Sequence, residues 1–366
     1  MTKKGLNVNY PEYQPVVEAT RGNIVESVHF GAVAIVDAYG RMIASHGDAD
    51  TVSFLRSSSK PIQVLPLVEQ GGADIYQLSD KEIAVMCASH AGTPDHVQTV
   101  ESIQAKINIT YEDLLCGSHF PHDDAASLEM HMKGESPTEN HNNCSGKHTG
   151  MLALCLLNSQ STEDYINPAH PTQQMILKTF ADMCGLKTAQ IESGVDGCSA
   201  PVFAVPMKSA AHSFARLCDP QGLTEQRANA CRRITRAMIS HPEMVAGPGR
   251  FDTQLMRAAR GKVVSKSGAE GYLLVGVMPG VLDPKNPGLG IAIKIADGDP
   301  SGRARSITAL EILNEMCILT EEELEELSDF NSRPICNWRG IEVGELRSTL
   351  KLDFPGFPAG MPLLPK

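Results

Sequence analysis

The chain has 366 residues, of which 42% are hydrophobic and 20% are charged, and this balance supports a sizeable buried core. At this length, one large domain or two apposed domains are expected. The formal net charge of −11 argues against nucleic acid as a partner, because phosphate contacts need clustered Lys and Arg side chains.

Two further properties concern the compartment in which the chain works. No run of about eighteen apolar residues occurs, so no membrane-spanning helix and no membrane partner are expected. Residues 1–11 contain basic side chains but lack the apolar stretch of a signal peptide, so none is expected. Ten cysteines in such a chain predict reduced thiols and a cytoplasmic location.

The N-terminal part of the chain reads as strands. Strand-like runs cover residues 24–29, 32–36, 42–44 and 52–55. The turn between the second and third runs contains Gly40, which suits the positive φ of a hairpin turn.

Helical periodicity dominates from about residue 59 to residue 260. The expected helices cover residues 61–69, 81–87, 97–107, 146–157, 171–184, 207–217, 224–239 and 251–259. Strand-like runs then return at 262–265, 272–278 and 289–296, and a late edge strand is expected at 341–345. Two further helices lie between them, at 301–319 and 321–327.

Strands at both ends of the chain around a helical insertion predict an α/β fold. We expect one discontinuous sheet domain from residues 1–58 plus 261–366. A mainly helical domain from 59–260 is expected beside it and carries part of the site, because clefts at such junctions are favoured places for ligands.

The run Arg56-Ser57-Ser58-Ser59-Lys60 lies between the last N-terminal strand and the first expected helix. Residues three apart on a helix share a face, so Ser57 and Lys60 can meet. A desolvated lysine with a lowered pKa can take the proton of a serine hydroxyl, and a helix N-terminus favours an oxyanion there. On this motif alone the alternative is favoured, in which the serines cap a helix and Lys60 is a surface residue.

A second serine and a second lysine lie far apart in sequence. Ser89 follows an expected helix, and Lys266-Ser267-Gly268 lies at the edge of an expected strand. Penicillin-recognising enzymes carry a similar run facing the nucleophile. A backbone N–H near Ala269 can join that of Ser57 as an oxyanion hole. Alone the run reads as an ordinary turn, but it becomes informative together with the Ser-x-x-Lys motif and the helices expected between them.

Two loops rich in small and polar residues carry cysteines. Cys144 and Lys147 are three apart at an expected helix start, and Cys198 follows Asp196 in a separate loop. Two thiolates, with His148 near in sequence, are candidate zinc ligands. Lysine is a rare ligand because its amine must be neutral to bind, so spacing alone favours buried structural cysteines. Cys144 as a nucleophile beside His148 is a third interpretation.

Taken together, these runs resemble the Rhizobium etli-type L-asparaginases, also called class 3 or thermolabile asparaginases. The similarity extends from Thr20 almost to the C-terminus and includes residues 241–247 and Gly249-Arg250. It implies a serine β-lactamase or penicillin-binding-protein-like α/β fold, with an antiparallel sheet flanked by helices and a large helical insertion. It also implies a homodimer that hydrolyses L-asparagine to L-aspartate and ammonia.

The resemblance implies the catalytic residues as well. The two Ser-Lys tandems of the family fall on Ser57 with Lys60 and on Ser89 with Lys266. We expect neutral Lys60 to take the proton of Ser57, which attacks the side-chain amide carbon. The second tandem then protonates the departing ammonia, and water hydrolyses the acyl-enzyme.

The zinc ligands of the family fall on Cys144, Lys147 and Cys198, and the resemblance implies that Zn²⁺ aids substrate affinity. Positions that line or support the site fall on Arg56, His148 and Asp196. Two alternatives stay open: another serine amidase of the same fold, such as a glutaminase or a β-lactamase-like enzyme, and a non-catalytic zinc or thiol module.

Overall fold

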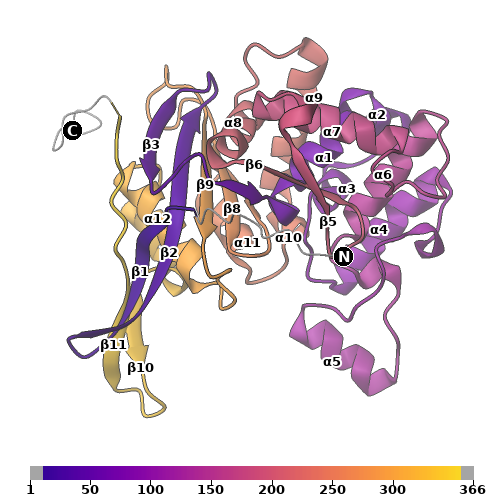
Figure 1. Cartoon of the computed structure of the whole chain (residues 1–366). Helices are drawn as coiled ribbons and strands as arrows, with labels where there is room; N and C mark the ends of the chain where they lie inside the picture. Colours follow the sequence, from indigo (N-terminus) through magenta and orange to yellow (C-terminus); the bar gives the residue numbers. More distant parts are fainter. Residues whose placement is uncertain (1–10, 356–366) are drawn as a thin grey trace, which may run out of the picture.

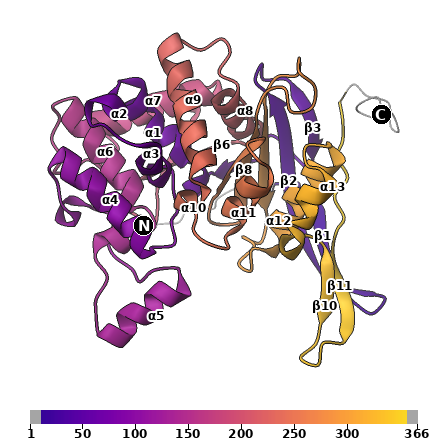
Figure 2. The same cartoon turned by 180° about the vertical axis from the view of Figure 1, so that it is seen from behind.

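The structure is a computed structural model that describes residues 11–355. Figures 1 and 2 show a large sheet on one side of the molecule and a cluster of helices on the other. The expectation that the chain begins without a signal peptide concerns residues 1–10, which lie outside the described part. Within residues 11–355, no helix combines the length and the apolar character that a membrane crossing requires.

Both ends of the chain build one antiparallel sheet. Its strands lie in the order β10-β11-β1-β2-β9-β8-β7, and β3 pairs with β2 off this path. The strands are β1 Gln14–Arg21, β2 Ile24–Asp37, β3 Met42–His46, β7 Val263–Ser267, β8 Tyr272–Val277, β9 Leu289–Ile295, β10 Arg333–Cys336 and β11 Glu342–Ser348. The turn after β2 contains Gly40 with φ 81°, which confirms the expected hairpin.

The side chains of β2 explain why helices cover both faces of this sheet. Ala34 and Val36 pack in one hydrophobic cluster with helix α8, whereas Val33 and Ile35 pack in a second cluster with α12. Successive side chains of a strand point to opposite faces, and a strand buried on both faces reads as a continuous apolar run. Figure 2 shows α12 on the face of the sheet away from the main helical cluster.

Of the helices in the described part, ten lie close to the expected ranges, whereas those at 72–75, 124–133 and 242–245 were not expected. The helices are α1 Lys60–Glu69, α2 Gly72–Ile75, α3 Asp80–Met86, α4 Pro94–Ile107, α5 Asp124–Lys133, α6 Ser145–Leu157, α7 Pro171–Cys184, α8 Met207–Cys218, α9 Glu225–Ser240, α10 Pro242–Val245, α11 Phe251–Ala258, α12 Arg303–Glu315 and α13 Glu321–Glu325. Most of them gather beside the sheet, and α5 projects from the end of this cluster (Figure 1).

Three strand expectations were wrong. The runs 24–29 and 32–36 form one strand, β2, because the backbone continues through Phe30 and Gly31. The late strand β11 is not an edge, because β10 pairs on its outer side. The helical region also contains two unexpected strands, β5 Glu192–Val195 and β6 Pro201–Pro206, which form a second, three-stranded sheet with the expected strand β4 Val52–Phe54.

The architecture confirms the expected fold class. It is an α/β fold with an antiparallel sheet between helices and a long, mainly helical insertion between the strand groups. The division into two domains at residues 58 and 260 stays a prediction.

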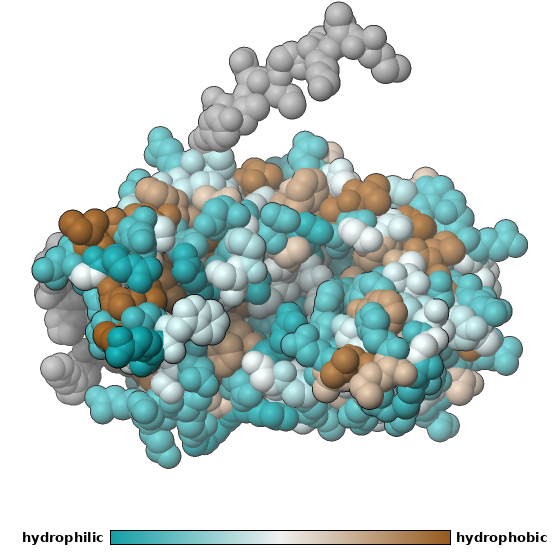
Figure 3. Space-filling view, turned by 90° about the horizontal axis from the view of Figure 1, so that it is seen from below, coloured by the Kyte–Doolittle hydropathy of each residue, from teal (hydrophilic) through white to brown (hydrophobic). Residues whose placement is uncertain are grey.

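The surface combines hydrophilic side chains with separate apolar patches. Figure 3 shows such patches, coloured brown, among hydrophilic residues on the face seen from below. Large exposed apolar side chains occur on the β1–β2 and β10–β11 hairpins, as at Ile24 and Trp338, and on α5, as at Leu128 and Met132. These projecting parts therefore expose apolar surface to solvent.

Candidate active site

A cavity of about 230 Å³ gathers residues that are far apart in sequence. It lies where the 3₁₀ turn η1 (Arg56–Ser59) meets the end of β7 and the start of α11. The lining residues are Ser57, Ser89, Asn143, Ala246, Arg250, Phe251, Asp252, Lys266, Ser267, Gly268, Ala269 and Arg305. Both predicted serines, one predicted lysine and Ala269 therefore surround one space.

The turn that carries Ser57 is packed tightly against the end of β7. Ser58 Oγ donates a hydrogen bond of 2.8 Å to the carbonyl oxygen of Lys266. A Cβ on Gly268 would lie 2.5 Å from the carbonyl oxygen of Leu55 and 2.9 Å from Ser58 Oγ, so only glycine fits without displacement. The Lys-Ser-Gly run therefore packs against the η1 turn and is not an ordinary surface turn.

Lys60 is buried, with 1% of its surface exposed, so the surface-lysine interpretation is wrong. Its Nζ donates to the carbonyl oxygen of Ala88 at 2.6 Å, to Ser89 Oγ at 3.0 Å and to the carbonyl oxygen of Asn143 at 3.4 Å. The hydrogen bonds of the described residues thus join Lys60 to Ser89 and not to Ser57. This pairing differs from the expected tandem because the side chain of Lys60 extends toward the loop after α3.

Lys266 is buried at the end of β7. Its Nζ donates to the carbonyl oxygen of Ser267 at 2.7 Å and lies 3.9 Å from Oδ2 of Asp252. Within residues 11–355, no hydrogen bond joins Lys266 to Ser89, its expected partner. Burial lowers the pKa of Lys266 to about 7, although Asp252 acts to raise it. Near neutral pH this amine is therefore able to carry protons in either direction.

Asp252 is a site residue that the sequence analysis did not identify. It lies in the first turn of α11, and its carboxylate accepts hydrogen bonds from Ser265 Oγ at 2.7 Å, Ser267 Oγ at 2.9 Å and the Ser267 backbone N–H at 2.8 Å. Burial acts to raise its pKa, but Lys266 and these hydrogen bonds outweigh burial and lower it. Asp252 therefore fixes the end of β7 on which Lys266 stands.

The three predicted zinc ligands lie together. Cys144 is the N-cap residue of α6, and Lys147 Nζ donates to Cys198 Sγ at 3.0 Å. Interaction between the two sulfurs lowers the pKa of Cys198 and raises that of Cys144, whose Sγ donates to Oδ1 of Asn143 at 3.0 Å. Burial acts to lower the pKa of Lys147, but the two sulfurs outweigh it and raise it. A thiolate and an ammonium group thus neutralise each other in the interior.

The chemistry of these donors fits a zinc ion. Zinc prefers sulfur and nitrogen ligands, and here two sulfurs and one amine face each other. His148 lies beside Cys198, and its Nε2 is buried with no hydrogen-bond partner, while its Nδ1 is 2.6 Å from the hydroxyl of Tyr165. No three His, Cys, Asp or Glu residues of the described part form a metal-binding group. The third ligand would therefore be the amine of Lys147, which must lose its proton to bind.

An ion pair connects the η1 turn to the loop that carries Cys198. Arg56 Nε donates to Oδ1 of Asp196 at 2.8 Å, and both side chains are largely buried. Arg56 itself has a positive φ of 51°, a conformation that costs a non-glycine residue on the order of 1–3 kcal/mol. The ion pair therefore stabilises the strained turn next to Ser57. Arg56 and Asp196 thus support the position of Ser57.

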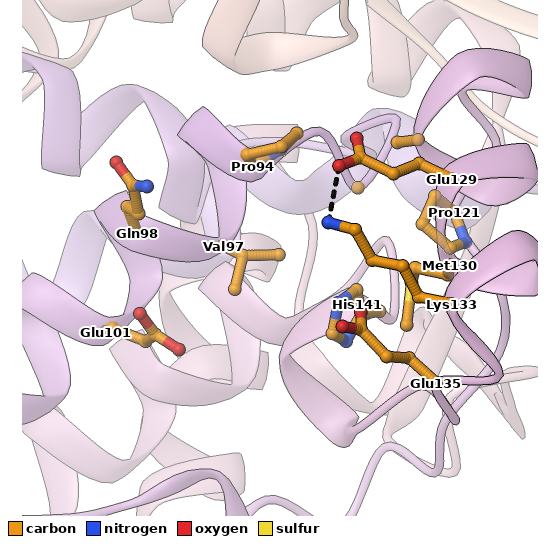
Figure 4. A pocket seen from close by; sticks show the side chains of 12 residues that line it. Pro94, Val97, Gln98, Glu101, Pro121, Glu129, Met130, Lys133, Glu135 and His141 are labelled. Carbon is orange, nitrogen blue, oxygen red and sulfur yellow. Dashed lines mark hydrogen bonds and ion pairs between the residues drawn. The ribbon is translucent and has the colours of Figure 1, made fainter.

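A second cavity, of about 270 Å³, lies between α4 and α5 and contains none of the predicted site residues. Figure 4 shows Glu101, Glu129 and Glu135 around it, with the ion pair between Lys133 and Glu129, whose atoms are 2.6 Å apart. Because it lacks a nucleophile beside a base, the chemistry is assigned to the first cavity.

No curated protein sequence matches the chain. Among solved structures, the crystal structure of Mglu shares 14% identity over 79% of this chain and 67% of that chain, with a TM-score of 0.37. A probable glutaminase from Bacillus subtilis, complexed with 6-diazo-5-oxo-L-norleucine, shares 12% identity over 79% and 84% of the two chains, with a TM-score of 0.38. These likenesses are too distant to support an argument about function.

The sequence model of the L-asparaginase II family matches residues 17–348. This match covers most of the chain and contains every predicted site residue, from Arg56 to Ala269. The chain therefore belongs to the L-asparaginase II family of amidohydrolases.

Proposed function

We propose that the protein is an L-asparaginase, which hydrolyses L-asparagine to L-aspartate and ammonia. The observation that carries this proposal is the cavity that brings Ser57, Ser89 and Lys266 together, with Lys60 bonded to Ser89, in a chain of this family. A volume of about 230 Å³ is below the roughly 300–1,000 Å³ of pockets for drug-sized ligands, so it suits a small amino acid.

In the proposed mechanism, Ser57 Oγ attacks the side-chain amide carbon and forms a C–O bond. Neutral Lys266, which lines the same cavity and has a pKa of about 7, takes the proton of Ser57. This assignment replaces the expected role of Lys60, which is engaged with Ser89. The proton then passes through Ser89 to the departing nitrogen, the C–N bond breaks, and ammonia leaves.

The remaining interactions stabilise the intermediate, and a last step releases the product. Backbone N–H groups at Ser57 and Ala269 stabilise the oxyanion of the tetrahedral intermediate. Lys60 fixes the hydroxyl of Ser89 from behind through its hydrogen bond. Water then attacks the acyl ester on Ser57, which releases L-aspartate and restores the serine.

Ammonia release from L-asparagine by the wild type, Ser57→Ala and Ser89→Ala tests the proposal. We expect Ser57→Ala to lose activity by at least about a thousandfold, because the covalent intermediate cannot form. Turnover near the wild-type rate in Ser57→Ala, with an inactive Ser89→Ala, would move the nucleophile to Ser89. The same assay with L-glutamine and a chromogenic cephalosporin decides between asparaginase, glutaminase and β-lactamase-like activity, and faster release from glutamine than from asparagine would refute the substrate assignment.

We also propose that Cys144, Lys147 and Cys198 hold one Zn²⁺ ion per chain. When bound, the ion would supply a Lewis-acidic centre that improves substrate affinity. Metal analysis of protein purified without chelator should give about one zinc per chain for the wild type and much less for Cys198→Ala, whose KM should rise. Zinc-free wild type and an unchanged KM in Cys198→Ala would together contradict this role.

The proposed biological unit is a homodimer in the cytoplasm. The family resemblance supports the dimer. The ten free thiols, none of which forms a disulfide among residues 11–355, support a reducing compartment such as the cytoplasm. Light scattering should give a mass of two chains at micromolar concentration. A mass of one chain under these conditions would contradict the dimer.

A further inference from the structure

Arg250 places a cation on the wall of the active cavity without an anionic partner. Its side chain is exposed, and among the hydrogen bonds and ion pairs of residues 11–355 none involves its guanidinium group. Only its backbone is bound, to Gly247 and Gln254. Arg250 is the N-cap residue of α11, and Arg257 on that helix pairs instead with Glu243 at 3.3 Å. The guanidinium of Arg250 is therefore available to a ligand of the cavity.

The loop that carries Arg250 is fixed to the segment that carries Ser89. The backbone N–H of Ser89 donates to the carbonyl oxygen of Val245 at 3.0 Å. A Cβ on Gly247 would lie 2.6 Å from Cβ of Ala91, so the two segments are in direct contact. Thr253 Oγ1 donates to the carbonyl oxygen of Gly247 at 2.8 Å and closes the loop. Arg250 thus has a defined position relative to Ser89.

The other cations of the cavity have anionic partners: Arg305 lies 3.9 Å from Asp299, and Lys266 lies 3.9 Å from Asp252. Among residues 11–355, Arg250 is therefore the lining cation whose charge is not balanced by an ion pair. Arg305 donates to the carbonyl oxygen of Gly268 at 2.9 Å, and Lys266 adds a partial charge near pH 7. The carboxylate of Asp252 is occupied by its hydrogen bonds to β7. An unpaired guanidinium on a cavity wall attracts an anion, and it binds a carboxylate through two parallel hydrogen bonds.

We propose that Arg250 binds the α-carboxylate of the substrate and thereby restricts the enzyme to amides that carry this group. The inference rests on the proposed amidase function and deepens it. Because Arg250 and Ser57 line one cavity of about 230 Å³, a four-carbon amino acid can place its carboxylate at one and its amide at the other. Arg305 fixes Gly268, another lining residue, through its hydrogen bond.

Three substrates and three variants test the proposal. L-Asparagine has both α-substituents, succinamate lacks the α-amino group, and 3-aminopropanamide lacks the α-carboxylate. We expect Arg250→Ala to raise KM for L-asparagine and succinamate by about 10- to 100-fold with a smaller change in kcat, as for a lost charged hydrogen-bonding pair. Its kcat/KM for 3-aminopropanamide should stay at the wild-type value. Arg250→Lys should recover part of the loss, and Arg257→Ala should match the wild type throughout.

Two results would overturn the assignment. An equal loss toward all three substrates in Arg250→Ala would indicate that the residue only maintains the loop. An unchanged KM for L-asparagine would show that another group binds the carboxylate.

Binding without turnover separates this inference from the proposed function. Calorimetric titration with L-aspartate should detect binding to the wild type and much weaker binding to Arg250→Ala. If the wild type released no ammonia from any amide yet bound L-aspartate through Arg250, the proposed function would fail and the carboxylate site would stand. Equal affinity of L-aspartate for both proteins would refute the site itself.

Discussion

Lys266 lies at the end of β7 with 1% of its surface exposed, and burial lowers its pKa to about 7. Below this pH the amine is protonated and cannot accept the proton of Ser57, whereas above it the amine is neutral. We therefore expect kcat/KM for L-asparagine to rise about tenfold per pH unit below pH 7 and to level off above it. Measuring kcat/KM from about pH 5 to pH 9 tests this, and a flat profile through pH 7 would exclude Lys266 as the base. Lys266→Arg is the control, because a guanidinium stays protonated throughout.

The interaction of Asp252 with Lys266 leads to a second prediction about pH dependence and stability. Its negative charge acts to raise the pKa of Lys266, so Asp252→Asn should lower that pKa and shift the acid limb of the pH profile to lower pH. The same change weakens the hydrogen bonds to Ser265 and Ser267, and unfolding in urea should show a loss of about 1–3 kcal/mol. The control is Ser265→Ala, which should lower stability but leave the acid limb where it is. A shift to higher pH in Asp252→Asn would contradict the sign of this interaction.

Sequence spacing predicted which residues gather at the site better than it predicted how they pair. Ser57, Ser89 and Lys266 line one cavity, but Lys60 bonds to Ser89. The spacing of Ser57 and Lys60 shows only that they share a helix face. It says nothing of the loop after α3, which supplies two of the three acceptors of Lys60. Asp252 could not be found either, because an acidic residue in the first turn of a helix is common.

The close packing of the η1 turn against β7 leads to a prediction about these two elements. A Cβ on Gly268 would lie 2.5 Å from the carbonyl oxygen of Leu55, so Gly268→Ala should push the turn away from the strand. We expect a stability loss of about 1–3 kcal/mol and a loss of kcat/KM at temperatures where the variant is fully folded.

Gly276→Ala is the matched control for this change. Gly276 lies on the neighbouring strand β8, where a Cβ would meet Cys218 Sγ at 2.4 Å, away from the active cavity. This variant should lose stability but keep the kcat/KM of the wild type. Equal activity of the two folded variants would show that the close approach at Gly268 serves stability alone.

The elements that were predicted well have strong local signals. Helix α7 covers Pro171–Cys184, the expected range, because a proline opens it and Gly185 in a left-handed conformation follows it. Strand β6 was missed because five of its six residues are buried, so the alternation that marks a strand is absent. Its partner β4 is also distant in sequence, and a single sequence contains no sign of that pairing.

At the scale of the whole molecule, the sheet joins the two ends of the chain, and the site lies where strand β7 of this sheet meets the helical insertion. Its lining extends from Ser57 on the η1 turn to Arg305 on α12, so no local motif could describe it. Each run was ordinary by itself, and only their combination indicated an amidase. The family match over residues 17–348 agrees with a site that depends on nearly the complete fold.

The burial of most thiols leads to a prediction about their reactivity. All ten cysteines are free, eight are buried, and only Cys317 and Cys336 are exposed. Burial raises the pKa of Cys87, Cys184 and Cys231 to about 12, so these thiols are neither ionised nor accessible near pH 8. We expect a thiol reagent that reacts with thiolates to modify two groups per chain rapidly, and the other eight only after unfolding in urea.

The double variant Cys317→Ser, Cys336→Ser is the control for this experiment and should show no rapid reaction while it stays folded. More than two rapid groups in the wild type would contradict the packing of the helical region around the cysteines. Fewer than ten groups after unfolding without reductant would reveal a disulfide and contradict the expectation of reduced thiols. Because Cys144 and Cys198 belong to the buried set, added zinc should leave the rapid count unchanged and slow only the reaction that follows partial unfolding.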